Sequence, residues 1–408
     1  MTDLNRRDVL SLAAAGATLA FAAPGWAAAP AAPKRLVVVM LRGAVDGLNV
    51  VVPYAEDAYY EARPTIAVPR PGAEDGALAL DDHFGLHPAL AAAMPLWRDK
   101  QLSFVHAARP PDPTRSHFDA QLFVENGTPG KHGTADGWMN RLLAALQGPH
   151  GPTEAVAIGP VLPQILHGKL AVSNLPLGPA AAKPLAIDKP EVGGLFDRLY
   201  SANDPLGRAW REGRAARTEL VAGLPQEEPP PEGGAAPANA FPAQAGRLAH
   251  LLTHDDRIRL VFASLGGWDT HVRQGNQTGQ LADRLRPLGE GLATLAQGLG
   301  PAWNDTVVVV ISEFGRTVRE NGDGGTDHGH GNAIWLAGGK VNGGRIYGEW
   351  PGLATARLYE GRDLAVTTDY RAVLAAVTGR HLGLSDRSLA QLFPGFSPAR
   401  SDLDKLLA

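Results

Sequence analysis

Carboxylates and imidazoles concentrate in two short loops of this chain. The stretch GTDHGHG contains Asp327, His328 and His330, and GGWDTH contains Asp269 and His271. Carboxylate oxygens and imidazole nitrogens are common protein ligands of divalent ions. Each loop comes after an apolar run that predicts a buried strand, so both loops should lie at one edge of a sheet. The residues predict a metal site there, and the alternative is a solvated loop with chance histidines.

Apolar runs predict the strands that position these groups. Residues 307–311 are all β-branched and show no polar alternation, which indicates a strand buried on both faces in a parallel sheet. Glu313 follows this run and is a further candidate metal ligand. The apolar run 35–41 predicts the first strand. Asp46 comes soon after it, and this carboxylate could bind metal or cap its own turn.

Ser116 is the candidate nucleophile. It follows a proline-rich segment, RPPDPTR, which favours extended backbone, and it begins a predicted helix that continues to about Val124. The commoner role of a serine in that place is the N-cap, in which the hydroxyl accepts a backbone N–H. A helix N-terminus also stabilises nearby negative charge, which would suit a serine that attacks an ester. The sequence alone leaves both interpretations open.

The composition of the chain excludes several classes of protein and of site. The 408 residues carry a formal net charge of −4, which argues against a nucleic-acid-binding surface. Hydrophobic residues make up 44% of the chain, as in an ordinary globular protein. Cysteine is absent, so disulfides, iron–sulfur clusters and thiol nucleophiles are excluded. Any metal must be held by histidine, carboxylates, hydroxyls or water.

The first residues predict an export signal. Arg6 and Arg7 precede a mildly apolar run, 12–23, and small residues follow at 25–29. Such an order is typical of a cleaved signal peptide, and paired arginines indicate the twin-arginine (Tat) route. We expect residues 1–28 to engage the Tat translocon, and the mature protein to be periplasmic or extracellular. An ordinary secretory signal or an uncleaved anchor is the alternative, but the apolar run is too short for a stable membrane anchor.

The rest of the chain, 29–408, predicts one α/β domain, because strand-like and helix-like segments alternate in both halves. Leucines at helical spacing across 281–299 predict a helix packed on the core. We also expect a helix at 87–97 and a strand at 363–367. Ala, Pro and Gly dominate residues 175–242, which predicts an inserted cap region that ends in a flexible loop.

Six motifs give the chain a resemblance to known proteins. They are LRGAVDGLNVVVP, PTRSHFDAQ, GGWDTH, SEFGRT, GTDHGHG and DLAVTTDYRAVL, and together they span nearly all of the mature chain. With them the sequence resembles a large bacterial family of exported proteins of unknown function within the alkaline phosphatase and sulfatase superfamily. The resemblance implies an alkaline phosphatase-like three-layer sandwich, with a mostly parallel central sheet and an inserted cap region.

The resemblance also implies roles for individual residues. That superfamily has an aspartate after the first strand, a Ser or Thr nucleophile at a helix start, an Asp/His pair, an acidic residue after a buried strand, and a late histidine. The matching residues here are Asp46, Ser116, Asp269 with His271, Glu313, and Asp327 with either His328 or His330.

This chain departs from the pattern at one position, because a phenylalanine, Phe314, stands where a histidine usually follows the acidic residue. One metal site would then be weakened or lost. His117 and Asp119 flank Ser116 and could add ligands. Arg42 and Arg115, and also Arg316, could hold the oxyanions of a substrate, and the alternative for each is a surface salt bridge.

The implied function is an exported metal-dependent hydrolase of phosphate or sulfate esters, acting on a small-molecule or polymer-borne substrate. Its cofactor would be a divalent ion, with zinc as the first choice and calcium, magnesium or manganese as alternatives. The competing hypothesis is an exported binding or assembly protein of the same fold that has lost catalysis.

Overall fold

The computed structural model describes residues 32–159, 161–175, 189–215 (other than 205, 209 and 212), 235–397 and 401–408. Within it, Pro33–Ala408 forms one compact unit. The predicted signal peptide and the loop predicted before residue 235 lie outside the described residues. Among the helices of the described part, none is long and apolar enough to cross a membrane.

A ten-stranded, mostly parallel sheet forms the centre of this unit. Strand β1 (Arg35–Leu41) lies between β10 (Thr306–Ser312) and β9 (Leu260–Gly266), and it pairs in parallel with both. Every residue of β1 and β10 is buried, as their unbroken apolar runs predict. Beyond β9, the strands β6 (Ala155–Ile158) and β7 (Ser173–Leu175) continue the parallel order.

Strand β11 (Asn332–Ala337) runs antiparallel to both of its neighbours, β10 and β5 (Leu102–Arg109). Since β11 begins at the edge where β10 ends, the intervening segment 313–331 leaves and re-enters the sheet on the same side. Short strands β12 (Arg345–Tyr347) and β13 (Thr368–Asp369) pair in parallel with β5.

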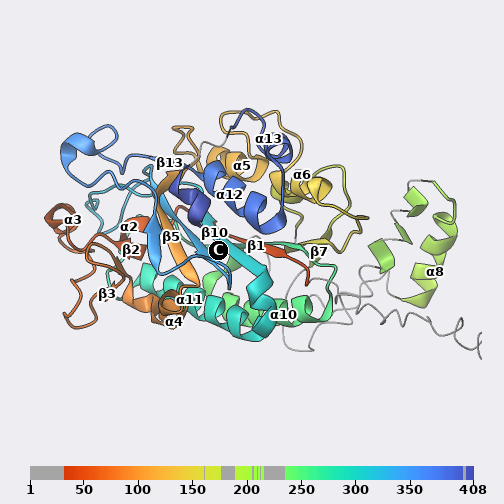
Figure 1. Cartoon of the computed structure of the whole chain (residues 1–408), viewed down its shortest axis with the longest axis horizontal. Helices are drawn as coiled ribbons and strands as arrows, with labels where there is room; N and C mark the ends of the chain where they lie inside the picture. Colours follow the sequence, from red (N-terminus) through yellow and green to blue (C-terminus); the bar gives the residue numbers. More distant parts are fainter. Residues whose placement is uncertain are drawn as a thin grey trace, which may run out of the picture. The chain divides into compact units, whose positions relative to one another are not determined.

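Helices cover both faces of the sheet, which confirms the predicted three-layer α/β architecture (Figure 1). Helices α10 (Phe241–His254) and α11 (Gln280–Leu299) pack on one face. Helices α6 (Trp138–Ala145), α12 (Tyr370–Leu382) and α13 (Asp386–Leu392) pack on the other. Alternate residues of β1 enter the two cores, because successive side chains of a strand point to opposite faces.

The remaining elements are short. They are α2 (Gly47–Val50), β2 (Val51–Val52), α3 (Asp57–Ala62), β3 (Leu78–Ala79), β4 (Gly85–Leu86), η1 (Pro88–Ala93), α4 (Met94–Arg98), α5 (His117–Asn126), η2 (Gln164–Leu166), α8 (Pro190–Leu199), β8 (Ala236–Pro237), η4 (Ala238–Ala240), η5 (Gly300–Asp305), η6 (Thr355–Arg357) and η7 (Asp402–Lys405). Strands β2, β4 and β3 form a small second sheet.

Two local predictions differ from the structure. The helix expected at 87–97 forms as the 3₁₀ helix η1 followed by helix α4, and η1 is itself kinked at Leu90, which has non-helical backbone angles (φ −91°, ψ 15°). The strand expected at 363–367 is wrong, since that segment is irregular and β13 begins only at Thr368. Asp363 instead directs its carboxylate to side chains of the site described below.

His106, on β5, is buried among aromatic rings. Only 1% of it is exposed, and its ring lies 4.7 Å from that of Phe84 and 4.8 Å from that of Trp350. Neither ring nitrogen has a hydrogen-bond partner. Burial lowers the pKa of His106 to about 3, because an imidazolium there would lose its hydration. The folded protein therefore holds this imidazole neutral at pH values where the unfolded chain would protonate it.

Replacing His106 with Phe should make the protein less sensitive to acid. The unfolded chain binds a proton on His106 below about pH 6.5 and the folded protein only near pH 3, so wild-type stability falls as the pH drops through this window. The loss is about 1.4 kcal/mol per pH unit, hence about 2–3 kcal/mol at pH 4.5. Denaturant titrations at pH 7.5 and 4.5 measure it. His132→Phe, at a mostly exposed histidine, is the control, and equal acid losses in all three proteins would contradict the prediction.

Candidate metal centre

The carboxyl ends of the central strands bring the predicted loops together. The GGWDTH loop follows β9, the SEFGRT loop follows β10, and the segment that leads into α5 follows β5. Because β1 pairs in parallel register with both β9 and β10, the first two loops emerge side by side. The predicted placement of these loops at one edge of the sheet is therefore present in the structure.

Two glycines allow the loops to approach one another closely. Gly43 has φ +117°, and a Cβ on it would lie 2.6 Å from the backbone nitrogen of Asp269. A Cβ on Gly315 would lie 1.9 Å from the carbonyl oxygen of Gly331. Any other residue at either position would push the loops apart, since real Cβ atoms do not come so near.

Three imidazoles and one carboxylate converge at this edge. The Nε2 atom of His328 lies 2.9 Å from Nε2 of His117 and 3.0 Å from Nε2 of His271. Asp269 Oδ1 lies 3.0 Å from His271 Nε2 and 3.3 Å from His328 Nε2, and Asp269 Oδ2 lies 3.4 Å from His117 Nε2. Ligand atoms of His117, Asp269 and His328 all lie within 4.8 Å of one another. We call these four residues the His–Asp cluster.

The other nitrogen of each imidazole faces a group that can only accept a hydrogen bond. His117 Nδ1 lies 2.8 Å from Glu313 Oε1, and His271 Nδ1 lies 3.1 Å from Asp327 Oδ1. His328 Nδ1 lies 2.9 Å from the carbonyl oxygen of Arg115. Each Nδ1 must therefore carry the proton, so in a neutral imidazole Nε2 presents its lone pair. Metal-binding histidines in proteins are held in this way by outer carboxylates and carbonyls.

The spacing of the His–Asp cluster fits a divalent ion. Around an ion with bonds of about 2.0–2.1 Å, tetrahedral ligand atoms are about 3.3 Å apart. The five separations of 2.9–3.4 Å lie close to that value. When the imidazoles are neutral, their Nε2 lone pairs face one another and repel, whereas a cation between them would be attracted to each. The residues present therefore fit a zinc-type ion.

The electrostatics of the cluster favour positive charge. Hydrogen bonds to Asp269 and Glu313 raise the pKa of His117 to about 9. Burial raises the pKa of Asp269, but hydrogen bonds from His117, His328 and Arg316 outweigh burial and hold that pKa well below its usual range. Both carboxylates are thus ionised near neutral pH, as burial of Glu313 is likewise outweighed by its hydrogen bonds with His117 and Gln121.

Phe314 fixes the orientation of two imidazoles. Its buried ring stacks on His117, with centroids 5.0 Å apart, and lies 5.2 Å from the ring of His328. The resemblance drawn from the sequence implied a histidine at this position. It contributes an apolar wall to the His–Asp cluster, whereas His117, from α5, supplies the imidazole beside Glu313.

The structure places Asp46 outside the His–Asp cluster. Both of its oxygens accept hydrogen bonds from the guanidinium of Arg63, at 2.6 and 3.0 Å, and Gln274 donates a third at 2.6 Å. Asp46 and Arg63 are both fully buried. The guanidinium of Arg63 thus already pairs with the carboxylate that the sequence predicts as a metal ligand.

Glu313 and Asp327 also differ from their predicted role as direct ligands. Each approaches an Nδ1 atom at the back of a histidine. Of the two late histidines that spacing could not distinguish, His328 belongs to the cluster. His330 lies apart from it, with its Nδ1 3.0 Å from Asp363 Oδ2.

The arginines expected at a substrate oxyanion have protein partners. Arg42 binds Gln121 and Glu125, each at 2.6 Å. Arg115 binds Glu360 and Asp363, each at 2.7 Å.

Arg316 is 1% exposed and ties the loops together. It donates to the carbonyl oxygens of Gly43, Ala44 and Thr326 and to the carboxylate of Asp269.

Ser116 caps helix α5, as one of the two interpretations expected. Its Oγ accepts from the backbone N–H of Asp119, at a long 3.4 Å. Hydrogen bonds of N–H to oxygen cluster near 2.9–3.0 Å, so this cap is weak. In the sequence, Ser116 lies between Arg115 and His117. The carbonyl of Arg115 contacts His328, and His117 belongs to the cluster, so the backbone of Ser116 is part of the site.

Sequence reasoning gave too little weight to His117, which it treated only as a possible extra ligand. The signal was its place beside Ser116 in PTRSHFDAQ, at the start of a predicted helix. Its contact with Glu313 joins residues 196 positions apart, so spacing in the sequence could not reveal it. Arg63, in the irregular stretch after β2, carried no recognisable signal.

Replacing Glu313 with Gln should weaken zinc binding about 10- to 100-fold, the usual effect of altering a carboxylate behind a metal-binding histidine. The amide removes the charge that supports His117 Nδ1–H and places donors beside Gly43 N–H and Gln121, which now donate to Glu313. Competition with a zinc chelator measures the affinity. Glu320→Gln is the control, because Glu320 contacts Thr65 and Ile66 outside the cluster. Unchanged affinity in Glu313→Gln would contradict the prediction.

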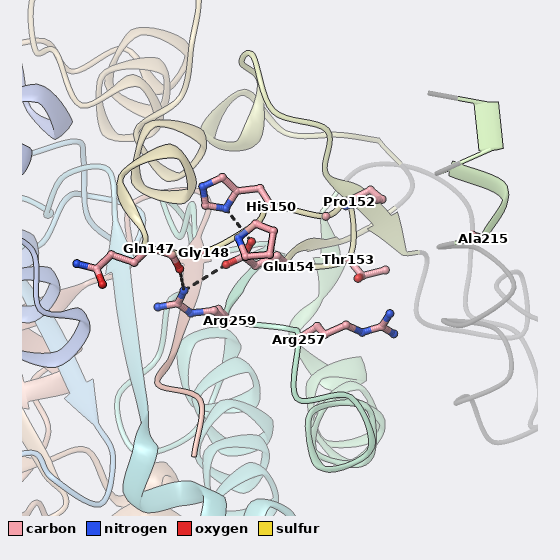
Figure 2. Close-up of a pocket in the computed structure, with 11 residues that line it drawn as sticks. Gln147, Gly148, His150, Pro152, Thr153, Glu154, Ala215, Arg257 and Arg259 are labelled. Carbon is pink, nitrogen blue, oxygen red and sulfur yellow. Dashed lines mark hydrogen bonds and ion pairs between the residues drawn. The ribbon is translucent and has the colours of Figure 1, made fainter. Parts of the chain in front are cut away.

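A separate cavity of about 550 Å³ lies at the opposite edge of the sheet, where β6 and β9 begin (Figure 2). Its charged groups pair with one another. His150 Nδ1 lies 2.9 Å from Glu154, and Arg259 contacts the same carboxylate at 3.3 Å. Its lining residues include one imidazole, that of His150, and so lack the convergent set found in the His–Asp cluster.

Fold and site together define a class: an α/β protein with a histidine–aspartate centre at the carboxyl edge of a mostly parallel sheet. The family described as "Protein of unknown function (DUF1501)" matches residues 33–393. The chain belongs to this family, which confirms the family resemblance drawn from the six motifs. No curated protein matches the chain in sequence.

Several solved structures show a distant similarity to this chain. Ps i-CgsB is 10% identical with a TM-score of 0.42, over 86% of this chain and 72% of that one. The C-terminal periplasmic domain of EcEptC from Escherichia coli, in complex with Zn, is 10% identical with a TM-score of 0.35, over 75% and 73%. BT1596, a 2-O GAG sulfatase, is 11% identical with a TM-score of 0.33, over 87% and 71%. These similarities are low, so the function proposed below rests on the geometry of the site.

Proposed function

We propose that this protein is an exported metal-dependent hydrolase of phosphate or sulfate esters. One observation carries the proposal: His117, His271 and His328 each have an acceptor at Nδ1, and their Nε2 atoms gather around Asp269. An arrangement of this kind matches the way proteins hold catalytic zinc.

The four residues of the His–Asp cluster would hold one divalent ion. Imidazole-rich sites favour zinc, whereas calcium and magnesium prefer oxygen ligands and manganese suits carboxylates, so zinc is the first choice. When bound, the ion would supply Lewis-acid polarisation of an ester oxygen.

The position of Arg63 supports a proposal of one ion. Because its guanidinium takes both oxygens of Asp46, that carboxylate has little capacity left for a second ion.

Ser116 is the proposed nucleophile. Its weak cap leaves the hydroxyl able to turn, and its backbone adjoins Arg115 and His117. Its Oγ would form a bond to the phosphorus or sulfur of the ester as the bond to the alcohol oxygen breaks, and the hydroxyl proton would leave with the alcohol. The amino end of α5 would favour the anionic ester on Ser116, which water would later release.

The alternative is an exported binding or assembly protein that has lost catalysis. The observation that favours it is the same pair, Asp46 with Arg63, since a site without a second ion has less means of releasing a seryl ester. Export by the Tat route, with residues 1–28 as the signal, stays part of both versions and rests on the paired arginines.

The test compares wild type with Ser116→Ala. Bound zinc is measured in both purified proteins, together with hydrolysis of an aryl phosphate and an aryl sulfate. We expect Ser116→Ala to keep its zinc, to lose about 0.5–2 kcal/mol of stability as a cap variant, and to lose ester turnover. Wild-type protein with a full zinc complement and no turnover on a broad ester panel would favour the binding alternative. Wild-type protein that binds no divalent ion would reject the proposal.

A further inference from the structure

Large apolar side chains are exposed next to the His–Asp cluster. The exposed large hydrophobic residues of the described part are Phe118, Val161, Leu195, Leu199, Leu206, Val272 and Tyr359. Three of them, Phe118, Val272 and Tyr359, come from separate segments that each adjoin the cluster. Single exposed apolar residues need no explanation, but a group of them at a candidate site indicates a binding surface.

Covalent neighbours and direct contacts tie each of the three to the site. Phe118 follows His117 and Val272 follows His271, so each has its Cα only about 3.8 Å from that of a cluster histidine. Tyr359 is next to Glu360, whose carboxylate binds Arg115 at 2.7 Å.

Helix α5 shows how Phe118 is placed. His117 and Gln121, one turn apart on α5, both contact Glu313, so this face of the helix is turned to the sheet edge. Phe118 lies about 100° further around the helix and is 89% exposed. The ring therefore borders the face that carries the cluster histidine.

Four of the cationic side chains around the centre are already engaged. Arg42 and Arg115 bind carboxylates, and Arg362 donates to the carbonyl oxygen of His328 at 2.8 Å. Arg316 is buried among carbonyl oxygens. A substrate with several negative groups would find no unpaired guanidinium among these four. These four arginines therefore leave the His–Asp cluster as the place for an anionic group, with Phe118 and Val272 exposed beside it.

We infer that the site takes phosphate or sulfate esters whose alcohol part is apolar, with Phe118 and Val272 as the residues that determine this specificity. The inference rests on the proposed function and narrows its substrate class. Apolar contacts with the alcohol part would supply affinity in proportion to the surface they remove from water. The anionic group would bind at the His–Asp cluster, as in sites where a few polar groups orient a mostly apolar ligand.

Binding of stable analogues tests this without relying on turnover. Phenylphosphonate and methylphosphonate, and likewise benzenesulfonate and methanesulfonate, are titrated into zinc-loaded wild-type protein by calorimetry. We expect the phenyl ligand of at least one pair to bind about tenfold tighter than its methyl partner. Phe118→Ala should remove most of that difference while leaving methyl-ligand affinity and zinc content as in wild type. Val161→Ala is the matched control, because Val161 is an exposed apolar residue that is not next to a cluster histidine in the sequence.

The outcomes distinguish failure of the apolar specificity from failure of the proposed hydrolase function. Equal affinity for phenyl and methyl ligands in wild type overturns the apolar specificity and leaves the anion site intact. A phenyl preference that survives in Phe118→Ala, in Val272→Ala and in their double variant also overturns it, because other residues then supply the contact. If no ligand of either pair binds the zinc-loaded protein, the proposed hydrolase site itself is rejected.

Discussion

Replacing His328 with Ala should lower the zinc affinity of the protein roughly 100- to 1000-fold. Structural zinc sites with four ligands provide about 10–16 kcal/mol, so one ligand contributes about 2.5–4 kcal/mol. His328 is the central member of the His–Asp cluster, since its Nε2 contacts both other imidazoles and Asp269. Competition with a chelator of known affinity gives the constant, and the zinc-dependent rise in thermal stability should shrink in parallel.

His330→Ala is the matched control, because His330 lies two residues further along the same loop. It is buried, and its Nδ1 faces Asp363 outside the cluster. We expect this variant to lose stability, because Asp363 keeps Arg115 but loses its contact with His330, and to keep zinc affinity close to wild type. Similar losses of affinity in both variants would mean that the loop, and not the imidazole of His328, determines binding. Unchanged affinity in His328→Ala would remove the metal centre from consideration.

Replacing Arg63 with Met should destabilise the folded protein by about 3–5 kcal/mol, because it leaves a buried carboxylate without its partner. The guanidinium donates to both oxygens of Asp46, to Asn49 Oδ1 and to the carbonyl oxygens of Thr317 and Val318. All of these acceptors would lose a charged donor at once. Denaturant unfolding at neutral pH measures the loss of free energy.

Two further variants make that result interpretable. Arg70→Met removes an exposed partner of Asp57 and should cost less than about 1 kcal/mol, the usual range for surface pairs. The double variant Arg63→Met with Asp46→Asn removes the buried charge and should regain a substantial part of the loss. If Arg63→Met cost no more than Arg70→Met, the buried pair would not be a significant source of stability.

The fold could be predicted because its signals are local. Residues 307–311 and 36–41 are apolar throughout, and only a strand covered on both faces would bury such runs. The leucines of 281–299 repeat at helical spacing, and they line one core in the structure. The strand expected at 363–367 was wrong because the backbone of this segment forms only isolated bridges, from Asp363 to Thr317 and Tyr359.

The location of the candidate site could be predicted from the sequence, but the contacts between its residues could not. Loop residues at strand ends identify the edge of the sheet, and the polar residue types identify the chemistry. Whether Glu313 faces an ion or the back of His117 depends on a helix that starts 196 residues earlier. Whether Asp46 is available depends on Arg63, which lies in an irregular stretch without periodicity. Such pairings are set by tertiary packing, which spacing alone does not encode.

Strand β1 has a consequence for engineering this protein. It lies between β9 and β10, which deliver Asp269 and Glu313, and it fixes the register of both without contributing a member of the His–Asp cluster. Strand β1 therefore sets the distance between the two loops, although it supplies no residue of the His–Asp cluster. Substitutions at exposed loop residues would leave the distance between the two loops unchanged. A single inserted residue within β1, however, would exchange its two buried faces and misalign both loops together.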